Sequence, residues 1–485
     1  MGAGPPAAAE RLTRASLTFD LLVRYLLVLY LWTSISWSSW ASWSGKSVWI
    51  SFRMSLNGEL WFGAYADGAQ EAVEYELNLV ETHIVASHSA ASALVFFFQN
   101  SQHTIGSIET LFRLFSPRSY RIQECSFSLD SLTEVIHEIV SDLSSTVKDK
   151  ILNCTAWRIS GIRKDTAQER QNFKSSDIEV LTANAIQSAL LAQGHFLPPV
   201  SLKQFDLEII LYVRGGIMAM GWADDEVRGL RASNKLIVGK GADILSKAQD
   251  HVAFILASFS LLLSESRCNL AGGEIRCCDP MCGVGTCLFA LAFLVSSHFP
   301  TLRPLCFGMD KDERSIHQAK ANLERTKLDS DRFRFFHCAC EEMSPKARED
   351  IPLNSIDIAI VDPPWGHRHG SFAQISRQTL RWARQWVAML RPEVGVLLVT
   401  TIRTRHLEQE VLPVLQRELG AELIRPPSSL NNGGFFQCKL FALRKTRPTT
   451  QVAQPAPVSR APPPRAVAAA GPPLVHKNEA PPCAD

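Results

Sequence analysis

Three carboxylates in the second half of the chain each stand at the end of an apolar segment, and this spacing limits the fold more than any other feature of the sequence. Asp279 opens the run DPMCGVGT, Asp310 closes the run LCFGMD, and Asp362 opens the run DPPWG. Each apolar segment has the length and composition of a buried strand. Because parallel strands end at one edge of a sheet, the sequence predicts that the three carboxylates converge on a single crevice.

The segments around these carboxylates alternate between helix-like and strand-like patterns. A long helix with an apolar face is expected over residues 242–263 and a strand over 274–278, and the alternation continues to about residue 443. Such alternation is typical of a doubly wound, mostly parallel sheet. The predicted fold class is therefore α/β, with a Rossmann-like domain over residues 226–444.

The first run has the composition of a cofactor-binding loop. Gly283 and Gly285 let backbone amides approach a ligand without interference from a Cβ atom, and a helix beginning near Thr286 points its amide end at a ligand carboxylate. Asp279 can accept a hydrogen bond from a ligand ammonium. A tight strand-to-helix connection, with glycines needed only for its geometry, is the alternative. A phosphate-binding loop is disfavoured because no GK[ST] ending follows.

Further acidic positions complete the predicted cofactor site. Asp310 is placed to bind both hydroxyls of a ribose, with Asp312 as the second choice for that role. The next strand is expected over residues 332–340, and Glu341 or a backbone amide at its end is expected to contact adenine. The predicted cofactor-binding residues are Asp279, Pro280, Cys282, Gly283, Gly285, Thr286, Asp310 and Glu341.

Together with the glycine-rich run, DPPWG resembles the catalytic loop of S-adenosylmethionine-dependent amino-methyltransferases, which implies methyl transfer to a planar amine. Such a transfer needs acceptors that hold the NH₂ group with its lone pair toward the methyl group, and an aromatic face for the extruded base. Asp362 and the carbonyl of Pro363 supply acceptors, Pro364 stiffens the loop, and Trp365 offers a face whose stacking contributes about 1–3 kcal/mol. A Pro-Pro turn beside a buried tryptophan is the alternative. Arg368, in the segment that follows, either meets a phosphate or stays solvated.

Composition limits the remaining classes of function. The 485 residues are enough for about three domains, and the formal charge of +2 is the small difference between 50 basic and 48 acidic residues. Affinity for nucleic acid must therefore come from local patches. Twelve cysteines are scattered, and the close pairs Cys278 with Cys282 and Cys338 with Cys340 lack the second half of a metal-ligand set. We expect reduced thiols and no structural metal.

Both ends of the chain differ from the rest. Residues 1–57 hold five of the eleven tryptophans and an apolar run at 21–32 that is too short and interrupted to span a membrane. An unstructured extension, a targeting segment and a membrane contact stay open for this region, and no stable membrane insertion is expected. Met54 is a candidate start for a shorter product. Residues 445–485 are rich in proline and alanine and are expected to form a disordered tail.

Between residues 58 and 225 the pattern indicates one or two small α+β units. Strands are expected over 60–65, 93–98, 155–159, 205–213 and 217–222, and helices over 68–77, 131–152 and 176–192. Late in the chain, the sequence NNGG at 431–434 fits a lid near the bound base and fits an ordinary hairpin loop equally well.

Three motifs in the first half match, in order, those of a known family. They are WRISGIRKD at 157–165, FKSSDIE at 173–179 and FDLEIILYVRGGIMAMGWA at 205–223. With them, the chain resembles the THUMP-domain family of RNA N2-guanosine methyltransferases over about residues 58–443. The run GAYADGAQEAVEYEL at 63–77 resembles the ferredoxin-like segment that usually precedes THUMP.

The resemblance implies a domain order and a substrate. A ferredoxin-like domain is expected over 58–125 and a THUMP RNA-binding domain over 126–225, gripping the end of a structured RNA, most commonly tRNA. Eukaryotic relatives work with a small zinc-binding activator subunit, and the compartment expected here is cytoplasmic or nuclear, with organellar targeting left open. A solvated basic loop is the alternative for the basic segment at 154–174. The predicted RNA-binding residues are Arg158, Arg163, Lys164, Arg170, Lys174 and Arg368.

Two departures from the family leave other functions open. Ala339 stands where the family usually has an adenine-binding acid, and Trp365 stands where many relatives have Tyr or Phe. Guanosine methylation of a spliceosomal small nuclear RNA and adenine N6 methylation use similar machinery. A non-catalytic RNA-binding protein with a degenerate methyltransferase fold is the alternative from a different class.

Overall fold

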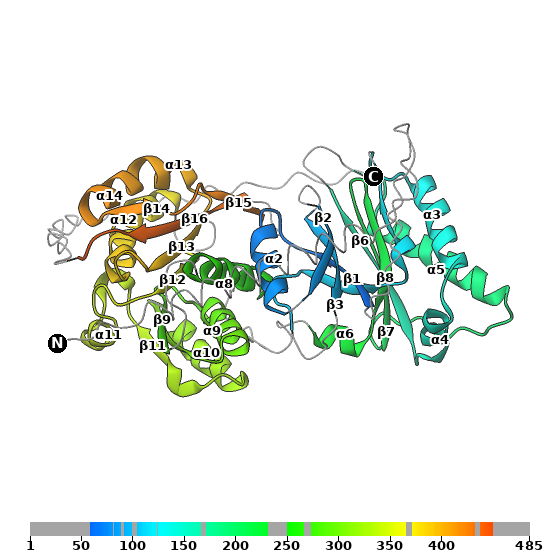
Figure 1. Ribbon diagram of the computed structural model, residues 1–485, viewed down its shortest axis with the longest axis horizontal. Coiled ribbons are helices and arrows are strands. Elements are labelled where there is room, and N and C mark those ends of the chain that lie inside the picture. The colour runs from blue at the N-terminus through cyan, green and yellow to red at the C-terminus, as the bar shows by residue number, and fades with distance from the viewer. Residues whose placement is uncertain are drawn as a thin grey trace, which may run out of the picture. The chain divides into compact units, whose positions relative to one another are not determined.

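The computed structural model describes residues 59–80, 82–88, 92–98, 104–123, 125–165, 171–230, 250–265, 273–364, 371–431 and 437–449 (Figure 1). Within these ranges the chain forms two eight-stranded sheets. The predicted N-terminal extension at 1–57 and the tail from residue 450 lie outside the described residues, as do most of the NNGG sequence and the end of the DPPWG run. No helix in the described part is long and apolar enough to cross a membrane.

The first sheet is mainly antiparallel, with strand order β2-β3-β1-β4-β8-β7-β6 and with β5 paired to β8. Only β6 and β7 run parallel to each other. The strands are β1 Glu59–Ala64, β2 His83–His88, β3 Ala93–Phe98, β4 Thr110–Leu114, β5 Tyr120–Ile122, β6 Trp157–Lys164, β7 Leu207–Arg214 and β8 Ile217–Ala223.

This sheet crosses the boundary that the resemblance places near residue 125. β4 pairs with β8 through Arg113 opposite Trp222 and Leu114 opposite Gly221. The two modules expected over 58–125 and 126–225 therefore share one continuous sheet. Pairing between strands so distant in sequence leaves no local pattern, and the sequence alone gave no reason to join them.

Five helices accompany the first sheet, namely α2 Gln70–Leu79, α3 Leu129–Ser141, α4 Ser145–Asn153, α5 Ser175–Leu191 and α6 Asp225–Gly229. The single helix predicted over 131–152 is wrong, because α3 and α4 are separate. Ser144 begins α4 as its N-cap, with its side chain accepting a hydrogen bond of 3.3 Å from Val147 N. A serine that caps the next helix competes with continuation of the first.

The second sheet has the order β11-β10-β9-β12-β13-β16-β14, with β15 paired to β16. Its first five strands run parallel, and β16 runs antiparallel to β13. The strands are β9 Gly273–Asp279, β10 Leu302–Asp310, β11 Phe333–His337, β12 Ile358–Val361, β13 Val396–Thr401, β14 Ala421–Leu423, β15 Ser428–Asn431 and β16 Gln437–Lys445. The helices are α8 Asp250–Glu265, α9 Thr286–His298, α10 Glu313–Arg325, α11 Pro345–Asp350, α12 Phe372–Met389, α13 Thr404–His406 and α14 Leu412–Leu419.

Apolar residues of these strands face two separate cores. In β12, Ile358 and Ile360 join the core that includes α8 and α9, whereas Ala359 and Val361 join the core that includes α12 and α14. Both faces of this strand are covered, which is why it is apolar and buried throughout. The prediction of a doubly wound, Rossmann-like sheet is confirmed.

The strand order reverses between β9 and β12. From β9 the chain proceeds outward to β10 and β11, then returns to place β12 on the other side of β9. Ligands of open α/β sheets bind at such a switch point, beyond the carboxyl ends of the strands. The fold therefore places a crevice where β9, β10 and β12 end.

The folded region ends later than predicted. Lys445 belongs to β16 and is completely buried, with Nζ donating hydrogen bonds to Asn354 Oδ1 (2.7 Å), the Ala388 carbonyl (2.9 Å) and Thr449 Oγ1 (3.2 Å). Burial without a carboxylate partner lowers the pKa of Lys445 to about 8. The chain is thus anchored up to Thr449, and the predicted tail boundary at residue 445 is wrong by a few positions.

Candidate functional site

Asp279, Asp310 and Asp362 lie at the ends of three adjacent strands. β9 lies between β10 and β12, and its register places Asp279 beside Gly308, two residues before Asp310. Burial raises the pKa of Asp279 well above its usual range, and the charges of Asp362 and Asp310 raise it further. The three carboxylates therefore lie near one another at the same edge of the sheet.

Backbone hydrogen bonds attach the glycine loop to the end of β10. Cys282 N donates to the Met309 carbonyl (2.8 Å), and Gly285 N donates to the Cys282 carbonyl (2.8 Å). Gly283 N donates to Asp310 Oδ2 (2.9 Å). These bonds fix the loop independently of any ligand.

Gly285 is required by both its backbone conformation and its surroundings. Its φ of 89° lies in the left-handed region, and a Cβ atom would lie 2.6 Å from the ring of Phe289. α9 begins at the next residue, Thr286, whose Oγ1 is buried and has no hydrogen-bond partner among the described residues. The loop therefore presents backbone amides and a hydroxyl at a helix N-terminus, which suits a ligand carboxylate.

The structure separates the roles of Asp310 and Asp312. Both oxygens of Asp310 accept backbone hydrogen bonds, from Gly283 N (2.9 Å) and Asp312 N (2.8 Å). Burial raises the pKa of Asp310, and the same two hydrogen bonds oppose that rise. Asp312 instead caps α10, accepting from Arg314 N (3.2 Å) and Ser315 Oγ (3.2 Å). Asp310 is thus the acid that faces the glycine loop.

Asp279 is suited to a cationic ligand. Its side chain is buried, and within the described part of the chain it accepts one hydrogen bond, from Met281 N (3.0 Å). No lysine or arginine of the described residues pairs with Asp279, Asp310 or Asp362. Lys311 lowers the pKa of Asp310 without forming an ion pair with it, so these carboxylates can still accept a cationic ligand. An ammonium and a sulfonium, both present in S-adenosylmethionine, would balance this charge.

Asp362 is held by a neighbouring strand. The hydroxyl of Thr400, on β13, donates a hydrogen bond to Asp362 Oδ1. Burial raises the pKa of Asp362, and the Thr400 bond lowers it. Pro363 and Pro364 follow directly and are partly buried, whereas Trp365 lies outside the described residues. Asp362 is therefore a fixed acceptor at the end of β12.

We expect Thr400→Val to shift the pH dependence of methyl transfer. Without the hydroxyl, the pKa of Asp362 rises, so more of the carboxylate is protonated at a given pH below neutrality. The acidic limb of the plot of kcat against pH should move to higher pH in Thr400→Val, with smaller changes in kcat at alkaline pH. Thr400→Ser keeps the hydroxyl and should show the wild-type plot. Steady-state rates measured from pH 5 to 9 test this, and an unshifted limb would contradict a positioning role for Thr400.

The adenine end of the site differs from the prediction. β11 ends at His337, so the strand expected over 332–340 is too long, and Cys338 N donates to the Asp310 carbonyl (3.0 Å). A turn of 3₁₀-helix covers Cys340–Glu342, with Ala339 as its N-cap. Glu341 is partly buried and accepts a hydrogen bond from its neighbour's thiol (3.5 Å). A role for Glu341 in binding adenine stays a prediction.

The cysteines near the crevice are protonated packing groups. Burial raises the pKa of Cys278, Cys282 and Cys287 well above the usual thiol range, and the charge of Asp279 adds to the rise in each case. The ten cysteines described are free thiols. Within the described ranges no group of three or more His, Cys, Asp or Glu could hold a metal ion.

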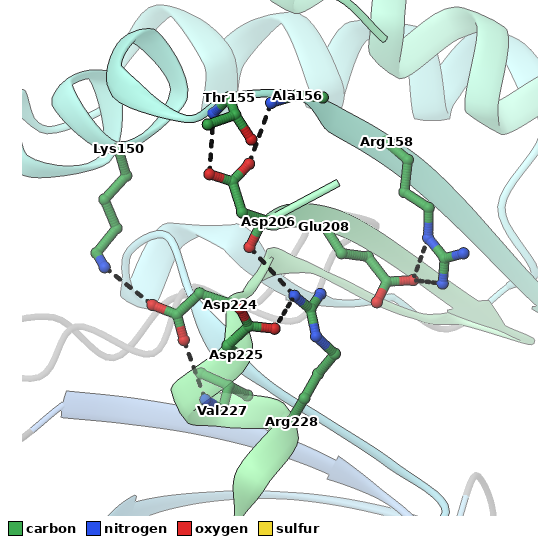
Figure 2. Close-up of polar contacts among 10 residues, drawn as sticks. All are labelled: Lys150, Thr155, Ala156, Arg158, Asp206, Glu208, Asp224, Asp225, Val227 and Arg228. Carbon is green, nitrogen blue, oxygen red and sulfur yellow. Dashed lines mark hydrogen bonds and ion pairs between the residues drawn. The ribbon is translucent and has the colours of Figure 1, made fainter. Parts of the chain in front are cut away.

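Most of the described cations predicted to bind RNA already have acceptors in the protein. Arg158 pairs with Glu208 at 2.6 Å (Figure 2) and Lys164 pairs with Glu109 at 2.5 Å. Arg163 donates to two backbone carbonyls at 2.9 Å and pairs with Asp165 at 3.2 Å. Lys174 is exposed, and Arg170 and Arg368 lie outside the described residues. RNA binding by these residues stays a prediction, with part of their charge neutralised.

Figure 2 shows that Arg158 belongs to a polar cluster that joins β6, β7 and α6. Asp206 accepts hydrogen bonds from the backbone amides that precede β6, Thr155 N (2.9 Å) and Ala156 N (3.1 Å). Arg228 donates to the Asp206 carbonyl (3.2 Å) and to an acidic neighbour on α6. These bonds tie the segment before β7 to the start of β6 and to α6. We therefore expect a structural role for the cluster.

Thr400 is the functional residue that sequence reasoning missed. It lies 38 positions beyond Asp362, and nothing distinguishes it from the adjacent Thr401 except that the two point to opposite faces of β13. Asn322 was missed for a similar reason, although its side chain donates to the Val284 carbonyl of the glycine loop (3.2 Å). An alternation argument applied to the end of β13 could have identified Thr400.

Comparison with known proteins agrees with this geometry. Residues 265–411 match the RMKL-like methyltransferase domain. The structure of TrmN from Thermus thermophilus is similar at 18% identity and a TM-score of 0.55, over 80% of this chain and 99% of that one. The structure of a possible methylase from Clostridium difficile 630 is similar at 12% identity and a TM-score of 0.56, over 81% and 100%.

A third similar structure, SMU.472 complexed with SAH, has 12% identity and a TM-score of 0.53, over 81% of this chain and 100% of that one. At these identities the likeness establishes the fold. No curated protein matches the sequence. The domain match and the strand order together identify residues 265–411 as a methyltransferase domain with a Rossmann-like fold, whose methyl donor is S-adenosylmethionine.

Proposed function

We propose that this chain transfers a methyl group to the exocyclic N2 amine of a guanosine in tRNA. The observation that carries the proposal is Asp362, a carboxylate fixed by Thr400 at the start of a rigid proline pair. An exocyclic amine that donates to such a carboxylate keeps its lone pair directed at the methyl donor. Asp362 can also take up the proton that the amine loses.

The first half of the chain supports RNA as the substrate. The three motifs that resemble the THUMP family fall on β6, on the start of α5, and on β7 with β8. The likeness to TrmN covers 80% of the chain, so it extends well beyond the methyltransferase domain. A sheet of this size ahead of the catalytic domain offers a second surface on which a structured RNA could be held.

The retained site geometry favours an enzyme over a non-catalytic RNA-binding protein. Burial raises the pKa values of Asp279, Asp310 and Asp362, and a cationic ligand would favour their ionised forms. Two glycines with positive φ shape the loop beside them.

Transfer of labelled methyl groups tests the proposal. The full chain is incubated with tritiated S-adenosylmethionine and separate pools of tRNA, small nuclear RNA and ribosomal RNA, with and without the small zinc-binding activator subunit. We expect label in tRNA that co-migrates with N2-methylguanosine after nuclease digestion. Label confined to small nuclear RNA would show that the substrate is not tRNA. Label in N6-methyladenosine would overturn the assignment of guanosine as the methylated nucleoside. No transfer to any RNA, together with no cofactor binding by calorimetry, would overturn the enzyme.

A further inference from the structure

Arginine is concentrated in the segment that follows the catalytic loop. Residues 371–406 contain six arginines and a single acidic residue, Glu393. This segment covers α12, β13 and α13. The excess of charge is local, because the whole chain carries a formal charge of only +2.

Three of these arginines have carboxylate partners. Arg384 makes two bonds to Glu418, at 2.7 and 2.8 Å. Arg391 pairs with Asp357 at 2.7 Å, and Arg381 lies 3.8 Å from a carboxylate oxygen of Glu342. Their charge is balanced within the protein.

The other three, Arg377, Arg403 and Arg405, have no carboxylate partner among the described residues, and we call them the arginine patch. Arg377 and Arg405 are exposed, and Arg403 is partly exposed. Arg377 donates only to the Ala373 carbonyl (3.2 Å), and Arg403 donates to Ser376 Oγ (2.7 Å). A guanidinium has five N–H donors, so most of the donors in the patch stay available.

Two contacts to Ser376 bring the patch together across two elements. The Ser376 hydroxyl accepts from Arg403, and the Ser376 carbonyl bonds to His406 Nε2 at 3.0 Å. Arg377 follows Ser376 on α12, and Arg405 precedes His406 on α13. His406 also pairs with Glu410 at 3.0 Å, and this acidic residue marks the boundary of the arginine patch.

The patch borders the catalytic loop. A small pocket is lined by Pro363, Pro364, Thr401, Arg403 and His406, together with apolar side chains of α12 and β13. Thr400, three residues before Arg403, bonds to Asp362. Pro363 and Pro364 directly follow Asp362, so the arginine patch lies beside the loop that would receive the base amine.

We propose that the arginine patch binds backbone phosphates of the RNA next to the nucleotide that is methylated. This inference rests on the proposed function and deepens it by naming the RNA-binding surface of the catalytic domain. Arginine binds phosphate through two N–H groups at once, and such contacts fix the register of a strand without reading its sequence. The patch sets the position of the backbone, and Asp362 receives the amine.

Salt dependence of RNA binding tests the patch directly. The probe is an unmodified tRNA transcript, titrated with full-length protein by filter binding between about 50 and 200 mM KCl. Each lost phosphate contact lowers the slope of log K against log[salt] by roughly 0.7–0.9, so the variant R377A/R403A/R405A should lose about 2 units of slope and ten- to a hundredfold in affinity. Its affinity for S-adenosylmethionine, measured by calorimetry, should stay within a few-fold of wild type.

Matched variants separate phosphate contact from general charge and from folding. R377K/R403K/R405K should keep most of the slope, and R384A, which removes a paired arginine from the same helix, should keep the wild-type slope and affinity. If the triple alanine variant fails to fold, R405A alone should lose roughly 0.7–0.9 units of slope, since this side chain makes no hydrogen bond among the described residues.

Two results would contradict phosphate binding by the arginine patch. One is a wild-type salt slope and RNA affinity in the folded alanine variants, and the other is an equal loss of slope and affinity in R384A. An acidic protein as the true partner of the surface would give the first of these. Failure of the proposed function is a different outcome, in which the wild-type protein methylates no RNA at all.

Discussion

Asp362→Ala should lower kcat for methyl transfer by about a thousandfold while leaving RNA and cofactor affinity within a few-fold of wild type. The change removes the acceptor that holds the amine and the group that takes its proton, and a positioned general base alone contributes 10²–10⁴ in rate. Thr400 holds Asp362 in place at the start of the proline pair, so the loss falls on a positioned acceptor. Single-turnover rates with saturating cofactor and RNA measure the effect on chemistry alone.

Asp362→Asn is the informative companion. Its amide oxygen can still accept one hydrogen bond from the substrate amine, but it cannot take up a proton. If orientation dominates, the asparagine variant should keep much more activity than the alanine variant, and if proton uptake dominates, the two should be equally impaired. Wild-type turnover by either variant would exclude Asp362 as the acceptor.

The second sheet was predictable because its strands are buried on both faces. The inner part of each strand is apolar and buried, and β9 and β10 each end on a carboxylate, Asp279 and Asp310. The residue that ends the strand is therefore also the residue that faces the crevice. For this reason the sequence located both the sheet and the carboxylates of its candidate site.

Contacts between distant parts of the chain could not be predicted in the same way. The pairing of β4 with β8, the bond from Thr400 to Asp362 and the ion pair of Arg158 with Glu208 each join residues 38 or more positions apart. None of them leaves a periodic pattern. Nothing in the sequence indicated that Arg158 and Lys164 of the basic segment at 154–174 are neutralised, because their partners Glu208 and Glu109 lie far away in the chain.

The same reasoning changes how a basic segment is interpreted in this chain. A cation contributes to RNA binding to the extent that its charge is available, and counting residues ignores the partners supplied by folding. Arg158 was a candidate by sequence, whereas Arg403 was not. The structure pairs the first with Glu208 and leaves the second without a carboxylate among the described residues.

Asp310→Ala should weaken binding of S-adenosylmethionine by at least about a hundredfold. If both ribose hydroxyls donate to this carboxylate, each charge-assisted bond contributes about 1.5–3 kcal/mol, and two of them exceed the 2.7 kcal/mol that corresponds to a hundredfold. The change also removes the acceptors of Gly283 N and Asp312 N, so the glycine loop loses its attachment to the end of β10. Isothermal titration with the cofactor measures the loss without requiring a known RNA.

Asp312→Ala is the matched control, because the two acids are two positions apart and the sequence could not choose between them. Asp312 caps α10, and loss of an N-cap typically costs about 1 kcal/mol of stability. Its variant should therefore unfold at a somewhat lower temperature and bind the cofactor within a few-fold of wild type. The reverse pattern, with cofactor binding lost in Asp312→Ala and kept in Asp310→Ala, would transfer the ribose contact to Asp312. It would also mean that the hydrogen bonds from Gly283 and Asp312 to Asp310 serve only to shape the loop.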